Sequence, residues 1–112
     1  MKVPTLQEVR DWAALTPAAI SDELLDGVRL SELEVQARTC WRGTPEQVAD
    51  ENAAYPDDLR QALYRRCARQ VAARLVPLGL VDSGGEYTPA RVPTWDAEVT
   101  RLEASRRIVA VA

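Results

Sequence analysis

The sequence predicts an all-α protein: a small bundle of about four helices, with a long Gly/Pro-containing loop before the last helix and an extended apolar C-terminal tail. Apolar residues recur at helical spacing in several segments, and helix-capping residues stand just before those segments. Hydrophobic residues make up 46% of the 112 positions, which is ordinary for one folded domain. We therefore expect a helical domain over residues 1–107, with a loop at 78–93, and a tail over 108–112.

Two helices are predicted in the first part of the chain. Thr5 and Glu8 have the spacing of a capping box, which indicates a short first helix. Ser21 is a suitable N-cap for a second helix over 22–41, and Gly43 is placed to end it. The apolar stripe of this second helix consists of Leu24, Leu25, Val28, Leu30, Leu33, Ala37, Cys40 and Trp41.

The next predicted helices are one short and one long. Thr44, Pro45 and Gln47 indicate one or two turns. The long helix, over 57–76, has apolar residues every four positions at Leu59, Leu63, Cys67, Val71 and Leu75. It also carries five arginines: Arg60, Arg65, Arg66, Arg69 and Arg74. Arginines within or beside such a stripe need a carboxylate partner, or must extend to water.

The last third of the chain is interrupted by glycines and prolines. Short extended pieces are expected on either side of Gly84-Gly85, and a long loop of this kind is typical of a functional segment. Thr94 then caps a last helix over 95–105. The tail that follows is apolar and β-branched, so it favours a role in which a partner receives it.

Several classes of chemistry are excluded or disfavoured by composition. The chain has no histidine, which removes histidine-based catalytic sets and histidine metal sites. Cys40 and Cys67 lie on apolar helical faces and are predicted to be free buried thiols. We therefore assign no catalytic, cofactor-binding or metal-binding residue, and no segment long and apolar enough to span a membrane. The three tryptophans are expected in the core: Trp12, Trp41 and Trp95.

Charge is unevenly distributed along the chain. The net charge is −3, but residues 1–58 carry −7 and residues 59–112 carry +4. Opposite halves of this kind attract within one chain, and they equally attract neighbouring copies arranged head to tail.

The order of these features resembles that of the head-to-tail connector (adaptor) proteins of tailed bacteriophages. The likeness covers nearly the whole chain and runs through four segments: Ser21-Asp22-Glu23-Leu24-Leu25; Asp58-Leu59-Arg60-Gln61-Ala62-Leu63 with the arginine-rich helix after it; Pro77-Leu78-Gly79-Leu80-Val81 with Glu86-Tyr87; and Pro93-Thr94-Trp95-Asp96-Ala97-Glu98-Val99 with Leu102 and Arg106-Arg107.

The resemblance implies a non-enzymatic structural protein of the virion, assembled in the host cytoplasm. Such proteins form a ring, usually of twelve copies, beneath the portal at the head–tail joint. The ring extends the DNA channel, which DNA crosses without specific binding, and it docks the next head-completion or tail protein.

The candidate contact residues fall in three groups. The tail that binds the portal or a neighbour is assigned Arg106, Arg107, Ile108, Val109 and Val111. The ring interface is assigned Arg60, Arg65, Arg66 and Arg69. The loop contacts are assigned Asp82, Glu86 and Tyr87.

The alternative is a small phage-encoded DNA-associated regulatory or packaging accessory protein. Clustered arginines contact phosphates well. The net negative charge argues against this alternative, because DNA-binding domains are typically basic. DNA binding with a steep salt dependence would favour it, whereas ring formation or portal binding without DNA affinity would favour the connector.

Overall fold

The computed structural model describes residues 1–75, 80–83, 86–89 and 96–108. Its helices are α1 (Leu6–Ala13), α2 (Asp22–Thr39), α3 (Pro45–Ala49), α4 (Asp57–Leu75) and α5 (Ala97–Glu103), which continues into a 3₁₀ turn, η2 (Ala104–Arg106). Two short strands, β1 (Leu80–Ser83) and β2 (Glu86–Pro89), stand between α4 and α5. The predicted all-α class is confirmed, and the short extended pieces expected on either side of the two glycines are present as this hairpin.

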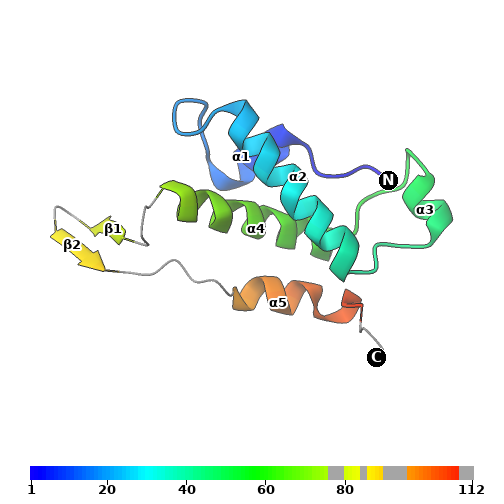
Figure 1. Ribbon diagram of the computed structural model, residues 1–112. Coiled ribbons are helices and arrows are strands. Elements are labelled where there is room, and N and C mark those ends of the chain that lie inside the picture. The colour runs from blue at the N-terminus through cyan, green and yellow to red at the C-terminus, as the bar shows by residue number, and fades with distance from the viewer. Residues whose placement is uncertain (76–79, 84–85, 90–95, 109–112) are drawn as a thin grey trace.

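Helix α4 lies at the centre of the bundle. It packs most extensively against α2 and α5, and Figure 1 shows it between those two helices. Its predicted stripe is confirmed over its described side chains, since Leu59, Ala62, Leu63, Cys67 and Val71 are all buried. The main core lies between α1, α2 and α4, and a smaller cluster joins Cys40, Tyr55 and Leu59.

Four helices, α1 to α4, begin where the sequence predicts. The hydroxyls of Thr5 and Ser21 accept hydrogen bonds from the backbone N–H groups of Glu8 and Leu24. The full capping box is present at α3, between Thr44 and Gln47. At α1 the prediction was only half right, because the Glu8 carboxylate does not return to the backbone. It accepts hydrogen bonds from Arg60 and Tyr64 of α4 instead.

Helix α2 ends earlier than predicted, at Thr39. Cys40 already has extended backbone, because it forms an antiparallel bridge with Arg107 from the far end of the chain. Gly43 therefore does not end this helix. It adopts a positive φ of 150° just before α3, where a Cβ would lie 2.8 Å from the Gln47 Oε1 atom that caps the helix.

The face that α2 buries is also different from the predicted stripe. Leu25 and Val28 are buried as expected, but Leu24, Leu30 and Trp41 are exposed. Glu32 and Gln36 are buried in their place, because both face a charged partner on α4 or α5. Trp12 is also not a core residue as predicted, since it is 42% exposed and stacks on the Tyr64 ring. Trp95 lies outside the described residues.

The segment before α5 contains the short extended pieces that the sequence predicts, paired as two strands. Strands β1 and β2 pair antiparallel, with Leu80 opposite Pro89 and Ser83 opposite Glu86, on either side of the two glycines at 84–85. Helix α5 is capped by Asp96, whose carboxylate accepts from the N–H groups of Glu98 and Val99. The predicted cap, Thr94, lies outside the described residues.

Both cysteines are free and buried, as predicted. Burial raises the pKa of the Cys67 thiol to about 12 and raises that of Cys40 as well. The nucleophilic thiolate form is therefore scarce at neutral pH, which fits two cysteines that serve as small apolar side chains.

Candidate functional site

The base of the C-terminal tail is held against the end of α2 by backbone hydrogen bonds. The Trp41 N–H donates to the Arg106 carbonyl (2.7 Å), and the Ile108 N–H donates to the Thr39 carbonyl (2.9 Å). These bonds flank the bridge between Cys40 and Arg107. Since residue 106 lies opposite 41 and residue 108 opposite 39, residues 106–108 run antiparallel to residues 39–41 at the end of α2.

Arg106 and Arg107, assigned from sequence to partner binding, are both engaged within their own chain. Arg106 Nε lies 2.8 Å from each carboxylate oxygen of Asp58. Arg107 forms an ion pair with Glu103 at 3.3 Å. These contacts fix residues 106 and 107 against α4 and α5. Ile108 follows directly and is 55% exposed, while Val109 and Val111 lie outside the described residues.

A buried polar network holds α5, and with it the tail base, onto the bundle. Glu103 is fully buried and accepts two hydrogen bonds of 2.7 Å from the Arg66 guanidinium. Gln36 of α2 donates to the same carboxylate (2.9 Å) and to the Leu59 carbonyl (3.0 Å). The Tyr55 hydroxyl donates to Gln36 Oε1 (2.6 Å). One network thus joins α2, α4 and α5.

The protonation state of Glu103 follows from these contacts. Burial acts to raise its pKa, but the hydrogen bonds from Arg66 and Gln36 outweigh burial and hold the pKa below the ordinary value of 4.5. Glu103 is therefore ionised at neutral pH, and its charge is matched by Arg66 and Arg107.

The free energy of unfolding is expected to decrease as the pH falls below about 4.5, because a carboxyl group with a depressed folded-state pKa binds its proton preferentially in the unfolded state. The stabilisation by Glu103 is complete above its unfolded pKa and is lost as the pH falls through the folded value. Urea titrations at pH 7 and pH 3.5 measure this loss. The loss should be smaller in the Glu103→Gln variant, and an equal loss in both proteins would assign the pH dependence to other carboxylates.

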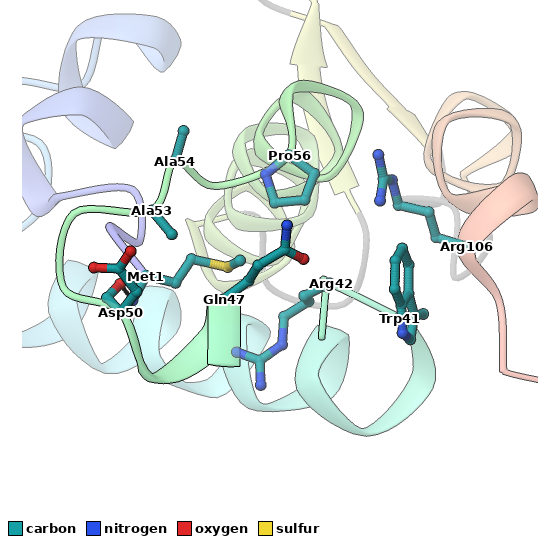
Figure 2. Close-up of a pocket in the computed structure, with 10 residues that line it drawn as sticks. Met1, Trp41, Arg42, Gln47, Asp50, Ala53, Ala54, Pro56 and Arg106 are labelled. Carbon is teal, nitrogen blue, oxygen red and sulfur yellow. Dashed lines mark hydrogen bonds between the residues drawn. The ribbon is translucent and has the colours of Figure 1, made fainter. Parts of the chain in front are cut away.

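An open groove of about 500 Å³ lies beside the tail base. Figure 2 shows Trp41 and Arg106 on one side and Met1 with Ala53 on the other. Arg42 also lines the groove and forms no ion pair with any described residue. The remaining lining residues are Gly43, Gln47, Asp50, Ala54 and Pro56.

The exposed tryptophan at this groove was not predicted. Trp41 is 55% exposed, although its spacing placed it on the apolar stripe of α2. The helix ends before Trp41, so helical spacing no longer determines which way the side chain points. Together with Ile108, it gives the tail base an exposed apolar surface of the kind found at protein interfaces.

The fold places the four arginines assigned to a ring interface in three different environments. Arg66 is buried against Glu103 and Glu32, so its guanidinium is engaged within its own chain. Arg60 bonds Glu8 of α1, which confirms the carboxylate partner expected for it. Arg65 and Arg69 remain partly exposed, and they line a shallow pocket of about 220 Å³ with Trp12, Ala68 and Asp96.

For the predicted loop contacts, the structure describes only the backbone pairing. Asp82 lies opposite Tyr87 in the hairpin register, and Glu86 lies opposite Ser83. The hairpin brings these three positions together at one end of a two-stranded ribbon. Their side chains are outside what the structure describes, so their role as contacts stays a prediction.

Within the described ranges, no group of acidic or cysteine side chains is arranged to hold a metal ion. In the same ranges, no helix has the length and hydropathy to cross a membrane. Comparison with family models, curated proteins and solved structures finds no match for this chain.

Proposed function

We propose that this chain is a structural head-completion protein of a tailed phage. Copies form an oligomeric ring beneath the portal, extend the DNA channel, and dock the next head–tail joining or tail protein. The observation that carries the proposal is that the base of the tail is held firmly on the domain. Two backbone hydrogen bonds and the ion pairs of Arg106 and Arg107 fix the residues that directly precede the apolar segment 109–112. A segment presented in this way suits insertion into a partner.

The tail-base surface, formed by Trp41, Arg42, Arg106 and Ile108, is the proposed contact with the portal. Trp41 and Ile108 offer exposed apolar area, and Arg42 offers a guanidinium without a carboxylate partner among the described residues. Tryptophan and arginine are the residue types that most often dominate binding energy at interfaces. Residues 108–112 would extend from this surface by about 17 Å if fully stretched.

The arrangement of charge supports a channel protein over a DNA-binding one. Eight of the described arginines form ion pairs with carboxylates of the same chain: Arg10, Arg29, Arg60, Arg65, Arg66, Arg101, Arg106 and Arg107. Paired guanidinium groups have less capacity to neutralise phosphates. A ring that lets DNA pass without holding it needs this property.

Deletion of the gene from its source phage tests the proposal. Electron microscopy is expected to reveal DNA-filled or leaking heads beside separate, complete tails, and the wild-type gene supplied in trans should restore joined particles. Normal tailed particles from the deletion strain would overturn the proposal. In that case, duplex DNA binding by the purified protein with a steep salt dependence would establish the DNA-associated alternative.

A further inference from the structure

The groove beside the tail base has apolar walls. Trp41, which is 55% exposed, lies on one side, and Met1 and Ala53 lie across from it, as Figure 2 shows. Ala54 and Pro56 add to the apolar lining. The volume of about 500 Å³ falls within the range of pockets that hold a ligand. The groove is therefore large enough to receive side chains of a bound segment.

Arg42 brings an unpaired positive charge to this groove. Its guanidinium forms no ion pair and no hydrogen bond with a described residue. A guanidinium carries five N–H donors, and the indole N–H of the neighbouring Trp41 is a donor only. These two consecutive residues thus offer an aromatic surface next to a free cation, which is a composition found at interface hot spots.

Two further side chains at the groove also have unused donors. The Gln47 Oε1 atom accepts a hydrogen bond from the Thr44 N–H (2.9 Å), which leaves the amide nitrogen of Gln47 available. Arg106 binds Asp58 through its Nε atom, and its terminal nitrogens form no hydrogen bond with a described residue. Each of these side chains can therefore donate to an occupant of the groove.

The acceptors at the groove are largely engaged. The Met1 ammonium donates to the carbonyl oxygens of Val48 (3.0 Å) and Asp50. The Ala53 carbonyl accepts from a backbone N–H (2.7 Å), and Asp50 Oδ1 accepts from the Asn52 N–H (2.9 Å). Because most of the unused polar groups are donors, the complementary occupant is one that supplies acceptors.

We infer that this groove binds a short acidic segment of a partner protein. A carboxylate of the segment pairs with Arg42, and a large apolar side chain beside that carboxylate packs against Trp41. The inference rests on the proposed function for the identity of the partner, which is the portal. It deepens that function by giving the chemistry of the segment that the tail-base surface meets.

A protein segment fits the groove better than a nucleic acid does. Both supply acceptors, but a nucleic acid carries a negative charge at every phosphate. The groove lies mostly within residues 1–58, which carry −7 in total and repel a polyanion. The apolar lining also matches apolar side chains rather than phosphates. One or two carboxylates next to an apolar residue satisfy both features of the groove.

A random library of twelve-residue peptides displayed on yeast tests the inference, with the full chain as bait. The library does not depend on any portal sequence, so its result is independent of the proposed function. We expect the selected peptides to share an aspartate or glutamate close to a large apolar residue. Replacing that acid with its amide in a synthetic peptide should weaken binding at least about 10-fold, measured by fluorescence anisotropy.

Variants of the chain locate the binding site. Arg42→Gln and Trp41→Ser should each weaken binding of the selected peptide at least about 10-fold. The matched controls, Arg38→Gln and Leu30→Ser, change exposed residues of α2 that do not line the groove, and they should bind like the wild type. Arg42→Glu should prefer the peptide in which lysine replaces the acid. Circular dichroism confirms that all variants remain helical.

The inference is overturned if the library yields no binder, if the binders share no acidic residue, or if Arg42→Gln or Trp41→Ser binds them as tightly as the wild type. DNA binding that Arg42→Gln abolishes would overturn it in favour of a nucleic acid. Peptide binding that requires deletion of residues 109–112 would overturn it in favour of the chain's own tail as occupant.

The inference and the proposed function can fail separately. Normal particles from the gene-deletion strain, together with acidic peptides that depend on Arg42 and Trp41, would refute only the proposed function. Blocked head–tail joining in that strain, together with a library that yields no acidic binder, would refute only the inference.

Discussion

Replacing Arg66 with methionine is expected to lower the free energy of unfolding by about 3–5 kcal/mol, because it leaves the fully buried Glu103 carboxylate without its main partner. The two 2.7 Å hydrogen bonds from the guanidinium would be lost. Gln36 and Arg107 would remain in contact with the charge, but neither makes a bidentate pair. Urea unfolding at pH 7 measures the change.

Two further variants distinguish the cost of leaving a buried charge unpaired from the cost of losing an arginine from the same helix. Arg65→Met removes a partly exposed arginine from the same helix, whose ion pair spans 3.8 Å, so it should cost less than about 1 kcal/mol. Adding Glu103→Met to Arg66→Met should recover much of the lost stability, because no buried charge then remains. Equal stability of the Arg66→Met and Arg65→Met variants would contradict this account of the network.

The interior position of Arg66 illustrates what the sequence can and cannot predict. Helical spacing correctly placed the apolar stripe of α4, with Arg66 at its edge. The partner of Arg66 is 37 residues further along the chain, and spacing within one helix carries no information about that distance. The same limit applies to Glu32 and Gln36, which are buried on α2 while Leu24 and Leu30 are exposed. Local capping signals at Thr5, Ser21 and Thr44 are read correctly because they act within one turn.

The end of α2 is a second feature that is determined by residues distant in the sequence. Helical periodicity continues through Cys40 and Trp41, so the sequence predicts a helix to residue 41. The backbone turns to extended conformation at Cys40 because Arg107 pairs with it. This pairing exposes Trp41 and creates the tail-base surface. The exposure of Trp41 therefore arises from contacts between distant segments, and sequence patterns alone did not reveal it, although they did assign Arg106 and Ile108 to partner binding.

Deletion of residues 109–112 is expected to abolish attachment of the protein to the portal-bearing head. The deletion removes the apolar segment but keeps Ile108, whose N–H bonds the Thr39 carbonyl. The ion pairs of Arg106 and Arg107 also remain, so the free energy of unfolding should stay within about 0.5 kcal/mol of the wild type. Co-sedimentation with heads from the gene-deletion strain measures attachment, and urea unfolding measures stability.

The chemistry of the tail can be separated from its length with two substitution variants. Val109→Ser with Val111→Ser keeps the backbone but removes apolar area, so this variant should fail to attach as the deletion does. Val109→Ile with Val111→Ile keeps apolar, β-branched side chains and should retain attachment. If heads bind the deletion variant normally, the tail is not the anchor. The contact would then be assigned to the exposed Trp41 surface, and Trp41→Ser would be expected to abolish it.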